Sequence, residues 1–400
     1  MSKKKELIPK LRFPEFKNEG DWELKLIGEI AISESSSLAL NKLELKQTGY
    51  LVYGADSIVG YIDDFQQAEK YISIVKDGSG VGRLNLCQSH SSILGTLASL
   101  KSKDSKHYYL DWIYYLLNTV NFSVYVKGAG IPHIYFSDYR NESIAVPQLK
   151  EQHKIASCLS SLDEVIAAHK QKLDLLKDHK KSLMQNLFPK RGEKVPRYRF
   201  EEFVKDGEWV ERKLEELAKR GSGHTPNKKA ANYYNGGIKW VSLADSNKLD
   251  NRYIYDTKIQ ISKEGIENSS AVLHPAGTVI LSRDAGVGKS AVLYSEMAVS
   301  QHFIVWVCEE SKLSNWFLYY VFQILKPAFE SIAVGSTIKT IGLPYFKELL
   351  IVVPSINEQL KIASCLFSID ELIAAQAEKI EQLKLHKKGL MQGLFPKMID

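Results

Sequence analysis

Residues 147–190 read PQLKEQHKIASCLSSLDEVIAAHKQKLDLLKDHKKSLMQNLFPK, and residues 354–397 read PSINEQLKIASCLFSIDELIAAQAEKIEQLKLHKKGLMQGLFPK. Aligned without a gap at an offset of 207 residues, the two stretches share 28 identities in 44 positions. Chance does not produce this agreement. The chain is therefore a tandem repeat, and the repeat decides the fold.

The duplication extends into the segments that precede these two stretches. Because the offset grows from 187 to 207 residues, the second copy carries an insertion. Each half is one variable globular domain followed by one long, nearly invariant segment. The predicted boundaries are a tail at 1–10, globular domains at 11–147 and 191–354, and helical segments at 148–190 and 355–397. The matching blocks are Leu11–Ala31 with Tyr198–Ala218, Val52–Asp56 with Val241–Asp245, Gly80–Arg83 with Gly286–Lys289, and 128–134 with 335–341.

Both long segments carry apolar residues at alternating spacings of four and three. This heptad pattern predicts a coiled coil. Proline disfavours helix in the residue before it, so the helices are expected to end near Phe188-Pro189 and Phe395-Pro396. About 36 residues per helix give a rod of about 54 Å. The predicted seam residues are Ile155, Leu159, Leu162, Ile166, Leu173, Leu176 and Leu183 in the first segment, and Ile362, Leu366, Ile369, Ile373, Ile380, Leu383 and Leu390 in the second.

Two such helices in one chain can pair with each other. We expect antiparallel pairing within the molecule, because it places the two globular domains at opposite ends; dimerisation through the same seam is the alternative. Polar residues interrupt both seams at matching places, His169 with Gln376 and Lys180 with Lys387. Such residues either set the register of the pair or are tolerated where a turn faces solvent.

The composition is that of a soluble globular protein. The 400 residues are 44% hydrophobic, and 53 basic against 47 acidic residues leave a net charge of +6, which is compatible with nucleic acid but does not establish it. The four cysteines form no C-x-x-C pair and no zinc-type cluster, so we expect buried thiols, no metal site and a cytoplasmic protein. No apolar stretch is long enough to cross a membrane. The cysteines are Cys87, Cys158, Cys308 and Cys365.

Each globular domain is expected to mix short strands with a few helices. Apolar runs rich in β-formers lie at Ile72–Val75, Val279–Leu281 and Phe303–Val307. Each domain also has one aromatic helical stretch, Tyr108–Leu117 and Trp316–Ile324. Aromatic side chains can stack on bases, but their equivalent placement in both copies predicts domain core.

A glycine-rich loop ends in a cation in both copies. Residues 282–290 read SRDAGVGKS, which looks like the phosphate-binding loop of ATPases. However, Arg283 occupies the place of that motif's first glycine, and the other copy has Arg83 and Leu84 where lysine and serine are required. We therefore expect no ATP site. The turn instead lets Arg83 or Lys289 approach a phosphate or a base edge.

Residues 127–133, KGAGIPH, and the matching residues 335–340, GSTIKT, form a second candidate contact loop. Glycine permits close backbone approach, and hydroxyls and lysine donate to phosphate; a simple turn is the alternative. The halves diverge at the serine run 33–37 and at 221–226, as two different readouts would need. The candidate DNA-binding residues are Lys76, Ser79, Arg83, Lys127, His133, Thr225, Lys228, Lys229, Tyr234, Arg283, Lys289, Ser336, Thr337 and Lys339.

The pattern I-x-x-P-x-x-x-E-Q-x-K-I-A, followed by a long helix, occurs at 144–156 and again at 351–363. This arrangement resembles the specificity subunit of Type I restriction-modification systems. The second half also resembles that family's target-recognition domain in its Thr225-Pro226 step and in the W-V-S-x-x-D pattern that ends at Asp245. The first domain lacks the Thr-Pro step, so its half of the target is the less predictable. The resemblance covers all but the first ten residues.

The resemblance implies an α+β fold in which two α/β target-recognition domains are separated by two long helices that pair as an antiparallel coiled coil. It implies that each domain reads one half of a bipartite site in double-stranded DNA, and that the helices set the unread spacer. Two methyltransferase subunits, which use S-adenosylmethionine to methylate adenine, and two motor-endonuclease subunits, which use ATP and Mg²⁺, would join this chain. The chain itself would have no catalytic centre and bind no cofactor.

Two other classes of protein compete with this interpretation. A fused methyltransferase would need an N-P-P-[FY] motif to hold a flipped base, and the sequence has no Pro-Pro dipeptide. A coiled-coil adaptor with two globular arms that does not read DNA stays open. Measured DNA binding would separate the adaptor from a specificity subunit.

Overall fold

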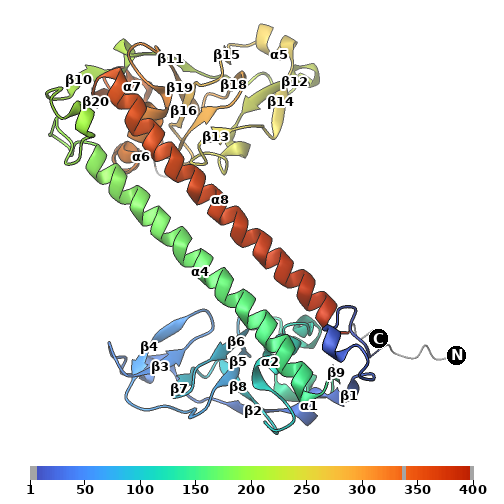
Figure 1. Ribbon diagram of the computed structural model, residues 1–400. Helices are drawn as coiled ribbons and strands as arrows, with labels where there is room; N and C mark the ends of the chain where they lie inside the picture. The colour runs from blue at the N-terminus through green and yellow to red at the C-terminus, as the bar shows by residue number, and fades with distance from the viewer. Residues whose placement is uncertain (1–6, 336–338, 397–400) are drawn as a thin grey trace. The chain divides into compact units, whose positions relative to one another are not determined.

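The computed structural model describes residues 7–335 and 339–396 (Figure 1). By its internal contacts the chain divides into two compact units. The first unit holds residues 1–171 and 377–400, and the second unit holds residues 172–376. Each unit therefore combines one globular domain with part of both long helices. The first unit is built from both ends of the chain.

The two long helices are α4, Leu149–Leu187, and α8, Ile356–Leu394, each of 39 residues. Each ends one residue before the Phe-Pro step, as the sequence predicts. In the first unit, Phe395 at the end of α8 shares a core with Ile155 near the start of α4. In the second unit, Leu187 at the end of α4 shares a core with Ile362 near the start of α8. The helices thus pair antiparallel within one chain, and the expected fold is confirmed.

The predicted seam residues all face the interior in part or in full. Flanking positions such as Leu175 and Leu385 are exposed, which is the pattern of one apolar stripe on each helix. The buried seam residues are Ile155, Leu159, Ile166, Ile362, Leu366 and Ile380, and the half-buried ones are Leu162, Leu173, Leu176, Leu183, Ile369, Ile373, Leu383 and Leu390.

The first globular domain holds a four-stranded antiparallel sheet in the order β2-β8-β5-β6 and a three-stranded sheet in the order β4-β3-β7, in which β3 and β7 run parallel. A separate ladder joins β1 to β9. The α helices are α1 Ile27–Ile30, α2 Leu110–Leu117 and α3 Phe136–Tyr139, and the strands are β1 Glu23–Leu26, β2 Ala31–Ser35, β3 Tyr50–Tyr53, β4 Ile58–Ile62, β5 Tyr71–Val75, β6 Leu84–Cys87, β7 Ser91–Ile93, β8 Leu97–Ser102 and β9 Ser143–Val146.

The second globular domain repeats this plan with one more strand in each sheet. The strand orders are β11-β19-β16-β17-β13 and β14-β12-β18-β15, and a separate ladder joins β10 to β20. Its α helices are α5 Lys263–Glu267, α6 Asn315–Ile332 and α7 Leu343–Lys347. Its strands are β10 Val210–Lys213, β11 Ala218–Ser222, β12 Tyr234–Val241, β13 Tyr253–Ile254, β14 Ile259–Ile261, β15 Leu273–His274, β16 Val279–Ser282, β17 Ser290–Leu293, β18 Met297–Val299, β19 Phe303–Cys308 and β20 Leu350–Val353.

Aromatic helices form the core of both domains, as the sequence predicts. Trp112 of α2 and Phe317 of α6 are fully buried. Trp112 lies edge-on to Trp22 with ring centroids 6.5 Å apart, and Phe317 stacks on Phe188 at 5.3 Å. Each aromatic cluster therefore includes residues from the ends of the long helices, because Phe395 joins Trp22 in the same way.

The expectation that the cysteines are buried thiols holds fully for one of them. Cys87 is buried, whereas Cys158, Cys308 and Cys365 are half-buried, and all four are free. Cys158 and Cys365 lie on the long helices, where one side of each residue faces solvent. Their partial exposure therefore follows from the narrow apolar stripe of a two-helix seam.

Candidate DNA interface and its helical support

A buried ion pair ties the start of each long helix to the first residues of the globular domain that precedes it. Arg12 donates from Nε and Nη2 to Glu151, both at 2.8 Å, and Arg199 donates in the same way to Glu358 at 2.8 and 2.7 Å. Both glutamate side chains are 1% exposed. These hydrogen bonds raise the pKa of both guanidinium groups above their ordinary value. The glutamate of the E-Q pattern is thus a structural anchor.

The glutamine that follows is a second anchor. Gln152 donates from Nε2 to the carbonyl oxygens of Pro147 and His107, both at 2.9 Å, and accepts from the Tyr109 amide at 2.8 Å. Gln359 makes the same three contacts: it accepts from the Ser314 amide at 3.0 Å, and it donates to the carbonyl oxygens of Lys312 at 3.0 Å and Pro354 at 3.1 Å. One side chain therefore holds the start of each long helix against the aromatic helix of its own domain.

The polar interruptions at Lys180 and Lys387 are paired with carboxylates of the opposite helix. Lys387 Nζ lies 2.5 and 2.7 Å from the oxygens of Asp163, and Lys180 Nζ lies 2.7 Å from Asp370. A buried tyrosine hydroxyl completes each group at 2.8 Å, from Tyr115 to Asp163 and from Tyr320 to Asp370. Burial raises the pKa of both phenols, so both stay protonated donors. This pairing favours the register-setting interpretation.

The other interruption is less regular. His169 is half-buried on α4 and Gln376 is buried on α8. Both make contacts with the rest of the protein. Neither is therefore a solvent-exposed position, which again fits a seam rather than a tolerated surface turn.

In the first unit the two predicted contact loops lie side by side. The Gly78 amide donates to the Pro132 carbonyl at 2.8 Å, and the Ile134 amide donates to the Lys76 carbonyl at 2.9 Å. Asp77 and His133 form an isolated bridge. The sequence predicted each loop separately, and the backbone joins them into one surface.

The cations of this surface are held by nearby carboxylates. Lys76 lies 3.1 Å from Asp77 and Lys127 lies 2.5 Å from Asp138, while Arg83 pairs with Asp56. Ser79, Arg83 and Lys127 are exposed, and Lys76 and His133 are half-buried. Ion pairs with an exposed cation, such as those of Arg83 and Lys127, are worth little in water, so these two cations can exchange a carboxylate for a phosphate.

The second unit brings its two loops together in the same way. The Ile341 amide donates to the Arg283 carbonyl at 2.9 Å, and Asp284 forms a bridge with Thr340. Lys289 and Lys339 line one cavity of about 580 Å³, together with Lys326 and Glu330. The cavity is therefore rich in ammonium groups. Arg283 is half-buried, and the candidates Ser336 and Thr337 lie outside the described residues.

The segment after β11 contributes a second cavity of about 530 Å³. Thr225, Lys228 and Tyr234 line it, whereas Lys229 is exposed and lies outside its lining. The Tyr234 hydroxyl donates a hydrogen bond to the Pro226 carbonyl at 2.7 Å. The other lining residues are Trp240, Ser242, Leu243, Ala244, Ile259, Ser300, Gln301 and His302.

Sequence reasoning missed the last three of these residues, Ser300, Gln301 and His302. They form the turn between β18 and β19, and no motif or repeated block marks them in the sequence. Their position next to Thr225 comes from the strand ladders, which bring together residues about 75 positions apart.

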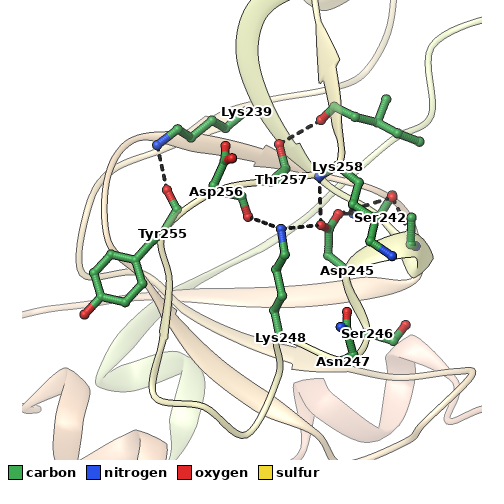
Figure 2. A network of polar contacts seen from close by, with 12 residues as sticks. Lys239, Ser242, Asp245, Ser246, Asn247, Lys248, Tyr255, Asp256, Thr257 and Lys258 are labelled. Atoms are coloured by element: carbon green, nitrogen blue, oxygen red, sulfur yellow. Dashed lines mark hydrogen bonds and ion pairs between the residues drawn. The ribbon is translucent and has the colours of Figure 1, made fainter. Parts of the chain in front are cut away.

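Asp245, the end of the W-V-S-x-x-D pattern, is a fully buried structural carboxylate (Figure 2). It accepts from the Ser242 amide at 3.2 Å and from the Lys258 amide at 2.9 Å, and Lys248 Nζ lies 3.1 Å away. Lys248 also donates to the Asp256 carbonyl at 2.8 Å. The pattern therefore fixes the loop before β14 against the end of β12.

Across 7–335 and 339–396, no group of three or more histidine, cysteine, aspartate or glutamate side chains could hold a metal ion. Over the same described parts, none of the helices combines the length and the apolar character needed to span a bilayer.

The two units define a tandem-repeat protein in which duplicated α+β domains share one antiparallel helix pair. A family model described as the Type I restriction modification DNA specificity domain matches residues 19–178 and again residues 206–385. The chain therefore belongs to the family of Type I restriction-modification specificity subunits, and the resemblance seen in the sequence is confirmed.

Relatives agree with this assignment over nearly the whole chain. The Type I restriction enzyme MjaVIII specificity subunit of Methanocaldococcus jannaschii is 24% identical over 96% of this chain and 93% of its own length. The specificity subunit of an Escherichia coli Type I restriction enzyme is 23% identical over 90% of both chains. The crystal structure of the M. genitalium S subunit superposes with a TM-score of 0.66 at 18% identity and covers 98% of this chain and 100% of that one, which supports the fold.

Proposed function

We propose that this chain reads a bipartite DNA target, with one half-site for each globular domain. The proposal rests on one observation: the two copies share the contacts that support the long helices, but their candidate contact loops differ in sequence. The anchors at Arg12, Gln152 and Asp163 recur as Arg199, Gln359 and Asp370 with nearly the same distances. The candidate contact loops of the two globular domains differ in sequence. An invariant support with divergent loops is what two different readouts on one scaffold require.

The cations of the loops supply contacts to the DNA backbone. Lys289 and Lys339 line one cavity in the second unit, and Arg83 and Lys127 are exposed in the first. Phosphate contacts position a protein on the duplex, and contacts to base edges specify the sequence. Both domains thus have basic groups next to loops that can enter a groove.

The chemistry belongs to partner subunits. Two methyltransferase subunits that use S-adenosylmethionine would methylate adenine in the target, and two motor-endonuclease subunits that use ATP and Mg²⁺ would carry out restriction. The chain itself has no catalytic role, binds no cofactor and selects the site. Because the target is DNA, we place the complex in the cytoplasm.

The test is modified-base sequencing of host DNA after co-expression of this chain with its cognate methyltransferase. We expect a split motif that carries N6-methyladenine. Exchange of Leu11–Pro147 for the first domain of another family member should change one half of that motif only. A change in both halves would refute the modular reading of DNA, and a complex that binds no DNA would make the chain an adaptor.

A second experiment tests whether the helices set the spacer. The anchors Asp163 and Lys180 on α4 have the same spacing as Asp370 and Lys387 on α8, so one heptad can be deleted between the anchors of both helices. Seven residues shorten a helix by about 10 Å, or about three base pairs of B-DNA. We expect a spacer shorter by that amount with unchanged half-sites. Deletion from one helix alone is the control, because it mismatches the anchors. An unchanged spacer would show that the helices do not measure it.

A further inference from the structure

The turn between β18 and β19, Ser300–His302, has an exact counterpart in the first unit at Leu94–Thr96. The Ser300 amide donates to Val241 at the end of β12 at 2.9 Å, as the Leu94 amide donates to Tyr53 at the end of β3 at 3.0 Å. At the other end of each turn, the Arg283 amide donates to the His302 carbonyl, and the Lys76 amide donates to the Thr96 carbonyl. The two backbones are therefore equivalent, and only the side chains differ.

In the first unit the first two residues of this turn, Leu94 and Gly95, carry no polar side chain and are covered. Leu94 is buried in a hydrophobic cluster, and Leu38 packs against the same cluster. The Gly95 amide donates to the Leu38 carbonyl at 2.7 Å, and a Cβ on Gly95 would lie 3.2 Å from that oxygen. The chain after β2 thus closes over Leu94 and Gly95, the counterparts of Ser300 and Gln301, whereas Thr96, the counterpart of His302, is exposed.

In the second unit the corresponding turn, Ser300–His302, carries polar side chains. The His224 amide donates to the Val299 carbonyl at 3.1 Å. A Cβ on Gly223 would lie 1.8 Å from that oxygen, so only glycine allows the approach. This contact brings Thr225 against Gln301, and the Thr225 hydroxyl donates to Gln301 Oε1. Thr225 stands three residues beyond its strand, as Leu38 does in the first unit.

Gln301 is exposed, and its bond from Thr225 leaves the amide nitrogen available to donate. Its neighbour His302 has Nδ1 2.9 and 3.0 Å from the carboxylate oxygens of Asp284, so this contact orients the ring and leaves Nε2 for a ligand. Ser300 is 1% exposed and lines the cavity of about 530 Å³. Within the described parts of the chain, its hydroxyl has no hydrogen-bond partner.

We propose that Ser300, Gln301 and His302 form a base-reading turn for the second half-site, with Asp284 as the residue that positions His302. The proposal rests on the DNA-reading function proposed above. Base edges in the major groove present donors and acceptors in patterns that an amide and an imidazole can match, and glutamine is a common partner of adenine. Lys228, which lines the same cavity, supplies a cation for the neighbouring phosphate. The first domain, with Leu38 and Gly95 at these positions, must read its half-site with other residues.

The experiment uses the complex of the full chain with its methyltransferase. Modified-base sequencing first gives the wild-type motif. Duplexes that carry this motif, and duplexes with one base pair changed at each position, are then bound by wild-type, Gln301→Ala, His302→Ala and Asp284→Asn complexes at one fixed salt concentration, because affinity for DNA depends on salt. Asp77→Asn is the matched control, since Asp77 occupies the place of Asp284 in the first unit.

We expect Gln301→Ala and His302→Ala to reduce the discrimination at one or two base pairs of the second half-site by about 5- to 150-fold. Asp284→Asn should reduce the discrimination at the same base pairs, and Asp77→Asn should leave this discrimination unchanged. Unchanged discrimination in the second half for both alanine variants would overturn the base-reading turn, as would an equal loss in both halves. A wild-type complex without a split motif would instead overturn the DNA-reading function itself.

Discussion

Arg199→Ala tests how firmly the first residues of the second globular domain are tied to α8. Arg199 and Glu358 are 9% and 1% exposed, and two hydrogen bonds of 2.8 and 2.7 Å join them. Arg199 Nη1 also donates to the Gly207 carbonyl at 2.5 Å. Truncation of Arg199 therefore leaves one buried carboxylate without its counter-charge and one carbonyl without its donor.

The expected loss in the free energy of unfolding is about 3–5 kcal/mol, the cost of breaking a buried ion pair from one side. Lys361→Ala is the matched control, because Lys361 and Glu202 join the same two segments at 3.0 Å while their side chains are 51% and 48% exposed. An exposed pair of this kind contributes about 0–1 kcal/mol. The two variants should therefore differ by at least about 2 kcal/mol.

Urea unfolding of the purified chain, followed by far-ultraviolet circular dichroism, measures both losses. The double variant Arg199→Met with Glu358→Leu should recover most of the stability, because it removes both buried charges together. If Arg199→Ala costs no more than Lys361→Ala, burial does not control the strength of this pair and the reasoning is wrong.

Three further predictions concern the second unit. Tyr320→Phe should lower the free energy of unfolding by about 1.5–3 kcal/mol, because its hydroxyl donates to the charged Asp370; an unchanged urea midpoint would count against it. Asp245→Asn should speed hydrogen exchange at the Lys258 amide, measured by mass spectrometry, because the carboxylate that accepts from this amide loses its charge; equal exchange rates would contradict this. Burial lowers the pKa of His274, so below about pH 6.5 the unfolded chain binds the proton more readily than the folded chain. Unfolding free energy should therefore fall as the pH drops through this range, and His274→Gln should reduce the fall; equal slopes would exclude His274 as the cause.

The long helices could be predicted from the sequence because their signal is local. A seam residue such as Leu159 is identified by neighbours three and four positions away, and the Phe-Pro step marks the end of the helix. The partners of Lys180 and Lys387 could not be predicted. Lys387 meets Asp163 across 224 positions of sequence, and only the register of the folded pair determines which carboxylate each lysine meets.

The candidate contact loops show a different limit. The repeated glycines indicated two loops in each half, but their meeting through Asp77 and His133 depends on a bridge between separate segments. Gln301 had no signal at all, since its counterpart in the other copy is Gly95, which has no side chain. Comparison of two copies identifies what is shared, and a residue that gives one copy its own specificity is by definition absent from the shared pattern.

The discontinuous first unit has a consequence for synthesis on the ribosome. Its core includes Leu394 and Phe395 together with Trp22, which is translated more than 370 residues earlier. At about 5–20 residues per second, the early part must wait tens of seconds, with the apolar face around Trp112 uncovered, before the end of α8 emerges. A product that stops before α8 would keep that face open and become a substrate for chaperones and proteases.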